Sequence, residues 1–173
     1  GLGWRPCGRG IQIGEVGVPI RLYDVLLRAG AIGLSVRDRD AGMIQGAAGY
    51  SVRNGPATQQ DRWEEDSGYS AFTIAVEIAT LLAAADAMRA AGRDSIARYL
   101  TETADGWNEQ IDDWAYARDT EISRRLGIDG YYMRIGFSSG DANARAHGLI
   151  PIKNRAEGNA ALQAGLLISP DAL

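Results

Sequence analysis

Cysteine and histidine are almost absent from the sequence: among 173 residues there is one of each, Cys7 and His147. A single cysteine cannot form an internal disulfide, and it excludes a cysteine-rich metal site. A single histidine argues against a histidine-based metal site and leaves one possible base for a Ser-His-Asp triad. It lies in the polar stretch GDANARAHG, where an ordinary loop histidine is the simplest interpretation.

Basic residues are also in the minority, because 18 Lys and Arg stand against 22 Asp and Glu, for a formal net charge of −4. This balance argues against a nucleic-acid partner, since phosphate binding needs a basic face. The longest apolar run, 71–91, is interrupted by Glu77, Asp86 and Arg89, which makes it a poor membrane span. We therefore expect neither nucleic acid nor a membrane as a partner. Length and composition fit a globular domain with a sizeable core.

The ends of the sequence carry no start or export signal. It begins GLGW without Met, and no charged-then-apolar segment follows, so the compartment is left open. It ends in Ser169-Pro170-Asp171, which is typical of a helix start. We expect residues 1–173 to be a fragment of one larger domain, truncated at both ends.

Helical periodicity dominates the first two thirds of the chain. It predicts helices over 11–29, 38–53, 71–91 and 94–117, with Ser70 as the N-cap of the third. Apolar side chains surround the axis of the third helix, which predicts burial on all sides. The fourth is apolar along one side only. This alternation fits two concentric helical layers, although an ordinary bundle gives the same pattern.

The helical period ends near residue 119. The glycine-bounded run DGYYMRIGF predicts a β-strand around Tyr131–Ile135, within a small β-hairpin near 130–153. The segment LIPIKN is its second candidate strand. Residues 136–165 are rich in Gly, Ala, Asn and Asp, and are predicted to be mostly loop.

The most unusual stretch is DRWEEDSGYS at 61–70, which places Glu64 and Glu65 side by side after Trp63. Neighbouring side chains cannot point the same way, so the two acids must have different roles. Cleavage of a glycosidic bond needs a protonated carboxylic acid beside the leaving oxygen, whereas an ionised carboxylate accepts hydrogen bonds from sugar hydroxyls. Trp63 and Tyr69 can pack against a sugar ring. Spacing alone favours a plainer interpretation, a solvated acidic helix entry with Trp63 in the core.

The segment NGPATQQDRWEEDSGYSAFTIAVEIATLLAAAD closely resembles the catalytic-domain segment of glycoside hydrolase family 15, in its bacterial glucoamylase and glucodextranase members. GIQIGEVGVP, DGYYMRI and SPDAL are similar to further landmarks of that family. The resemblance implies an all-α fold, part of an (α/α)6 barrel of inner and outer helices. It also implies an exo-acting, inverting hydrolase that releases β-glucose from the non-reducing ends of α-glucans. The implied partner is an α-glucan oligosaccharide or polysaccharide, and neither a cofactor nor a metal is expected.

The resemblance implies roles for single residues of the 61–70 stretch. Glu64 matches the family's general acid, and Glu65 matches a residue that hydrogen-bonds the substrate. Trp63 and Asp61 match positions that shape the pocket and support the acid.

Further candidates for substrate binding lie outside that stretch. Glu15 stands alone, because Gly14 occupies the place of the family's aspartate. Trp4 is a candidate for the pocket mouth, with packing near the chain end as the alternative. Arg9, Arg62 and Arg134 can reach substrate hydroxyls, although surface solvation is the simpler interpretation for each.

An inverting mechanism also needs a general base, a second carboxylate about 6.5–9.5 Å from the first. In the family this base lies beyond the stretch corresponding to residue 173, so the chain alone is expected to be inactive. The alternative is a catalytically incomplete helical module that binds carbohydrate or a partner protein. Family members are often exported, and the linkage accepted (α-1,4, α-1,6 or α,α-1,1) stays open.

Overall fold

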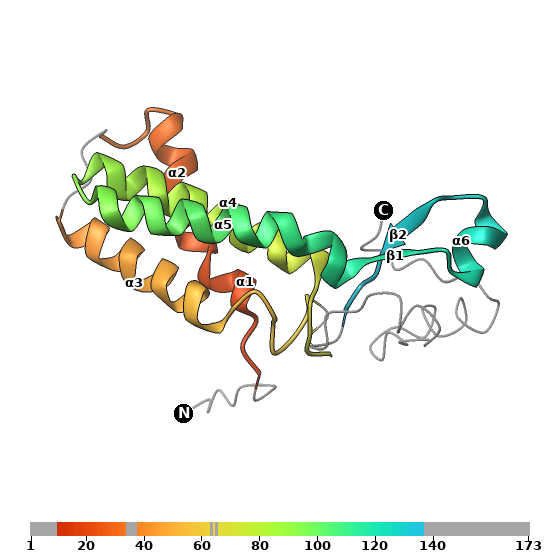
Figure 1. The fold of residues 1–173 in the computed structure, drawn as a ribbon. Helices are drawn as coiled ribbons and strands as arrows, with labels where there is room; N and C mark the ends of the chain where they lie inside the picture. The colour runs from red at the N-terminus through yellow and green to blue at the C-terminus, as the bar shows by residue number, and fades with distance from the viewer. Residues whose placement is uncertain (1–9, 34–37, 63, 65, 137–173) are drawn as a thin grey trace, which may run out of the picture.

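The computed structural model describes residues 10–33, 38–62, 64 and 66–136. The helices up to residue 115 form a layered bundle, and an arm with two short strands and a short helix extends from one end of it (Figure 1). The elements of the described residues are α1 (Ile13–Val16), α2 (Val18–Arg28), α3 (Asp38–Asn54), α4 (Ala71–Ala90), α5 (Asp94–Ala115), β1 (Tyr116–Arg118), α6 (Glu121–Leu126) and β2 (Gly130–Tyr132).

Helix α4 lies at the centre of the bundle and packs against α1, α2, α3 and α5. Ser70 caps it as predicted: its hydroxyl oxygen accepts a hydrogen bond from the backbone N–H of Thr73 at 3.4 Å. By length and composition the helix could cross a membrane, but 56% of its most apolar window is buried inside the protein. It therefore serves as a core helix.

The prediction that α4 is buried on all sides is wrong for one face. Phe72 and Leu82 are 46% and 40% exposed, and Asp86 is exposed on the same face. The elements that pack on α4 bury its other faces, whereas on this face Arg28 of α2 pairs with Asp86 at 3.2 Å and leaves the apolar side chains exposed. Helix α4, whose apolar side chains surround its axis, therefore leaves one apolar face exposed to solvent.

The helix predicted over 11–29 is divided at Gly17. The backbone of Gly17 lies so close to Thr80 of α4 that a Cβ would overlap the threonine side chain, which requires glycine here. Pro19 stands in the first turn of α2, where its missing N–H is harmless. Gly30, with a φ of 69°, ends the helix as predicted.

The helices predicted over 38–53 and 94–117 are confirmed as α3 and α5. Helix α3 ends at Asn54, before Gly55-Pro56, and α5 follows α4 after three residues as its antiparallel neighbour. Much of the core consists of alanine, whose small side chain lets helices approach closely. The fully buried core side chains include Ile20, Ala41, Ile44, Ala48, Leu81, Ala84, Ala85, Met88, Ala97, Leu100 and Ala104.

The predicted small antiparallel sheet is present, with a different partner strand. Strand β2 pairs with β1, which precedes it, in a register that sets Tyr116 opposite Tyr132. The two rings meet edge to face at 4.9 Å. The candidate strand in LIPIKN lies outside the described residues.

Helix α6 between the two strands was missed. The hydroxyl of Thr120 accepts a hydrogen bond from the N–H of Ser123 at 3.1 Å, and Gly127 ends the helix at a φ of 67°. A helix of six residues is too short to show a period. Its capping threonine and terminal glycine were the signals available.

Candidate active site

The residues predicted to carry the chemistry lie in the loop that enters α4. We call residues 58–69 the acid loop. An antiparallel bridge closes it: the N–H of Thr58 donates to the carbonyl of Gly68 at 2.8 Å, and the reverse bond measures 2.9 Å. Inside the loop the N–H of Asp61 donates to the carbonyl of Asp66 at 2.8 Å. These bonds give the loop a defined backbone.

Glu64 lies within the inner closure of this loop. Its N–H donates to the carbonyl of Asp61 at 2.9 Å, and the side-chain amide of Gln60 lies 3.5 Å from its carbonyl oxygen. Its φ is 61°, in the left-handed region that glycine favours. Such a conformation costs about 1–3 kcal/mol in a non-glycine residue and persists where the surroundings enforce it. The side chain is exposed, as a group that meets a ligand must be.

Asp61, predicted to support the acid, is fully buried. Its side chain has 0% exposure and forms an ion pair with Nη1 of Arg134. Nη2 of the same guanidinium donates to Oδ2 of Asp66 at 2.6 Å. The side chain of Arg134 is itself only 4% exposed. One arginine from the segment after β2 therefore binds two carboxylates of the acid loop.

Of the three arginines considered from the sequence, Arg62 and Arg134 have protein partners, and Arg9 lies outside the described residues. The expectation of a solvated Arg134 is wrong, because the side chain is buried between two aspartates. Arg62 places its guanidinium carbon 4.8 Å from the ring centroid of Phe72, and so lies over the open face of α4.

The segment after β2 also supports the end of the acid loop. Tyr69 and Gly136 exchange two backbone hydrogen bonds of 2.6 Å each. The ring of Tyr69 stacks on Trp114 of α5, with centroids 4.9 Å apart and planes 13° apart. The ring predicted to pack against a sugar is thus half-buried against the protein.

The segment before α1 meets the acid loop from another side. The N–H of Ile11 donates to the side-chain carbonyl of Gln59 at 3.2 Å. Glu15 is exposed on α1, and among the described residues no hydrogen bond or ion pair joins it to the acid loop. A Cβ at Gly14 would lie 3.7 Å from the Thr73 side chain, an ordinary van der Waals contact without overlap.

The structure therefore brings Asp61 and Glu64 together in one loop and places Glu15 on a neighbouring helix. The other predicted site residues, Trp4, Trp63 and Glu65, lie outside the described residues. Among the residues that the structure describes, no group of three His, Cys, Asp or Glu side chains can hold a metal ion.

A second carboxyl group of interest is buried in α4. Glu77 is 1% exposed, and neither of its side-chain oxygens has a hydrogen-bond partner among the described residues. Burial raises the pKa of Glu77 to about 8, because the charged form loses its hydration. The hydroxyl of Ser51 is also buried and unpaired. Glu77 belongs to the core, since it is closed off from solvent.

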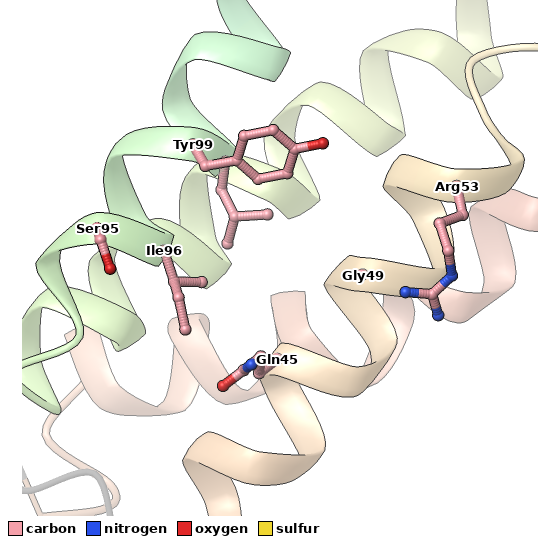
Figure 2. Close-up of a pocket in the computed structure, with 7 residues that line it drawn as sticks. Gln45, Gly49, Arg53, Ser95, Ile96 and Tyr99 are labelled. Carbon is pink, nitrogen blue, oxygen red and sulfur yellow. The ribbon is translucent and has the colours of Figure 1, made fainter.

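A hollow of about 350 Å³ lies between α3 and α5. Figure 2 shows Gln45, Gly49 and Arg53 on one wall and Ser95, Ile96 and Tyr99 on the other. No residue of the acid loop lines it, so it is separate from the candidate active site.

Comparison with known proteins decides the family. The model of "Glycosyl hydrolases family 15" matches residues 9–170. The chain belongs to this family. As a family 15 chain it is 37% identical to a glucoamylase of Clostridium sp. (strain G0005) over 81 residues, which cover 47% of this chain and 11% of that protein.

The fold of this family 15 chain is similar to a crystal structure of a bacterial glucoamylase complexed with acarbose. The TM-score is 0.66 at 31% identity, over 80% of this chain and 19% of that chain. The all-α fold predicted as part of an (α/α)6 barrel is thereby confirmed. The chain spans about a tenth to a fifth of the length of the relatives that it matches.

Asp66 was not predicted from the sequence, and Arg134 was considered only as a solvated side chain or a contact to substrate hydroxyls. Asp66 follows the two glutamates and had no motif of its own, while Arg134 is 73 residues from Asp61. The resemblance of DGYYMRI to a family landmark was the one signal that marked the segment of Arg134.

Proposed function

We propose that this chain carries the acid half of the catalytic site of a glucoamylase-type glycosidase. The reaction is exo-acting hydrolysis with inversion, which releases β-glucose from the non-reducing ends of α-glucans. Membership of family 15 supports this, as does the similarity to a bacterial glucoamylase bound to acarbose. We further propose that residues 1–173 are part of a single (α/α)6 catalytic domain.

The observation that carries the proposal is the exposed side chain of Glu64 on a constrained backbone. A general acid must meet the bridging oxygen of the scissile bond within hydrogen-bond reach, about 2.6–3.2 Å, and donate its proton as the bond breaks. The φ of 61° and the closure of the loop hold the Cα of Glu64 in one place, while its carboxyl group is free to meet a ligand. Glu64 is therefore our candidate for the acid.

Neighbouring residues receive supporting roles in this proposal. Asp61 is buried and paired, so it holds the loop and does not touch the sugar. Glu65 is assigned to hydrogen bonds with substrate hydroxyls, and Trp63 to packing against the sugar ring. Glu15 and Trp4 are assigned to the pocket wall. No general base is assigned among the described residues.

Activity of a Glu64→Gln variant tests the proposal. The protein is expressed at the full length that its gene encodes and assayed on maltooligosaccharides for glucose release. We expect a loss of about 10²- to 10⁴-fold in kcat, the usual contribution of a general acid. Glu102→Gln, at an exposed site on α5, is the matched control. Unchanged activity of Glu64→Gln would eliminate Glu64 as the acid.

Two further measurements, the anomer of the released glucose and the binding of maltooligosaccharide, distinguish this proposal from a carbohydrate-binding module without activity. Proton NMR of freshly released glucose should give the β anomer first, as inversion requires. A protein that binds maltooligosaccharide in calorimetry but releases no glucose would favour a carbohydrate-binding module.

A further inference from the structure

Among the Lys and Arg side chains that the structure describes, Arg134 is the most deeply buried, and it lies beside the candidate active site. It lies between Asp61 and Asp66, whose side chains are 0% and 23% exposed. These two aspartates stand three residues before and two residues after Glu64. A cation between two neighbouring carboxylates offsets their mutual repulsion.

Backbone hydrogen bonds of the acid loop join the same two aspartates to each other and to Glu64. Asp61 and Asp66 are joined by a backbone hydrogen bond of 2.8 Å, and Glu64 donates to the carbonyl of Asp61 at 2.9 Å. A shift of either aspartate is therefore transmitted to the Cα of Glu64. A left-handed φ in a non-glycine residue persists where surrounding contacts enforce it, and these backbone bonds are such contacts for Glu64.

Arg134 is itself held in place by the two residues after it. Gly136 is bonded to Tyr69 at the end of the acid loop, and a Cβ at Gly136 would overlap the backbone carbonyl of Trp114. The arginine thus extends from a segment fixed against both α5 and the loop. This segment and the loop form one unit although they are far apart in sequence.

A buried ion pair is a weak source of stability, because the cost of removing charges from water offsets most of the attraction. Apolar residues of similar volume often replace such pairs without loss of stability. What the pair supplies here is a fixed geometry with two directional bonds from one planar group. The part of the protein that needs this geometry is the loop that presents Glu64.

We propose that Arg134 is a positioning residue for the general acid. Through Asp61 and Asp66 it fixes the loop so that the carboxyl group of Glu64 meets the leaving oxygen. This inference rests on the proposed function of Glu64.

The positioning role of Arg134 can be tested with two substrates, one whose cleavage requires a general acid and one whose cleavage does not. Maltotriose has a poor leaving group that must be protonated, whereas α-glucosyl fluoride releases fluoride without a proton. In the protein expressed at its encoded length, Arg134→Met should lower kcat on maltotriose about 10²-fold, the size of effect expected for a misplacement near 1 Å. On the fluoride we expect less than about a threefold change, because the acid is not used. Arg134→Lys should recover part of the lost activity on maltotriose.

Control variants show whether a loss of activity comes from the Arg134 contacts or from a general loss of structure. Arg118→Met removes an exposed arginine of β1 and should leave both rates unchanged. If Arg134→Met does not fold, as judged by circular dichroism, Asp66→Asn is the deciding variant, because it removes the charge that pairs with the same guanidinium at a partly exposed site. It should show the same split between the two substrates, with a loss of about tenfold on maltotriose.

Equal losses on both substrates, or no loss on either, would overturn the role of Arg134. The proposed function fails separately: Glu64→Gln must itself lose activity on maltotriose and keep much more on the fluoride. If Glu64→Gln shows this split while the Arg134 and Asp66 variants do not, the function stands and the positioning role is wrong.

Discussion

Glu77 is a single residue whose protonation should be visible in the stability of the whole domain. Its pKa is raised to about 8 by burial, above its ordinary value of 4.5. Below pH 4.5 Glu77 is neutral in both the folded and the unfolded chain, and the stability that its raised pKa provides is fully present. Between pH 4.5 and 8 only the folded chain keeps the proton, so the free energy of unfolding falls as pH rises.

Replacing Glu77 with Gln should remove this dependence, because the amide stays neutral. We expect similar stabilities for the two proteins near pH 4.5, and a variant more stable by on the order of 4 kcal/mol near pH 8.5. Urea denaturation across this pH range measures the difference. Glu109→Gln, at an exposed position on α5, should follow the wild-type slope. If the free energies of unfolding of Glu77→Gln and wild type differ by the same amount at every pH, Glu77 is ionised in the folded protein.

Gly68 is a second residue with a measurable role. Its φ is 143°, and a Cβ here would overlap the carbonyl oxygen of Gly136. Gly68→Ala should therefore destabilise the protein by about 2–3 kcal/mol in thermal denaturation, through strain where the acid loop meets the segment of Arg134. Gly106→Ala, in an open part of α5, should instead stabilise by about 0.5–1 kcal/mol. A neutral Gly68→Ala would contradict the close contact.

The role of a single residue could be predicted from the sequence where its contacts are with near neighbours in the chain. Ser70 was identified as a cap because capping depends on neighbours three residues apart. Arg134 was misjudged because its partners are distant in the chain, and no spacing rule reports a contact across 73 residues. Glu77 was visible only as a polar residue in an apolar run, since burial depends on what packs around it.

At the scale of secondary-structure elements, α4 connects the acid loop to the core. Its first turn begins where the loop ends, and Ser70 satisfies one of its free N–H groups. Ser70→Ala should cost about 1 kcal/mol in urea denaturation. Ser67→Ala, an exposed change in the same loop, should have almost no effect. Equal effects from both variants would mean that the cap does not stabilise α4.

Long helices could be predicted and short or composite elements could not. Helices α3, α4 and α5 have 17 to 22 residues, long enough for their helical character to be recognised in the sequence. Helix α6 and strand β1 have six and three residues, too few for a period. Gly14, Gly17 and Pro19 weaken the first half of the 11–29 pattern in the sequence. The place of the break, at Gly17, depends on a tertiary contact with Thr80 and could not be predicted.

At the scale of the whole molecule, open apolar faces distinguish this chain from a closed barrel. Helix α2 buries Ile20 toward α4, while Leu22 and Val25 on its opposite face are 56% and 60% exposed. A helix that is apolar on opposite faces is typical of an element covered on both sides. The chain spans 19% of the bacterial glucoamylase chain that it matches, so this face is our candidate contact for further helices of an (α/α)6 barrel.

Produced as residues 1–173, the chain should therefore associate through this face, because exposed apolar patches drive self-association. We expect oligomers in sedimentation velocity and binding of a hydrophobic dye. The double variant Leu22→Lys, Val25→Lys should shift the chain to monomer with its circular dichroism unchanged. Ile20→Lys, on the buried face, should instead unfold it, since an unpaired charge would enter the core. If the double variant unfolds the chain as Ile20→Lys does, Leu22 and Val25 are core residues of this chain and not an open face.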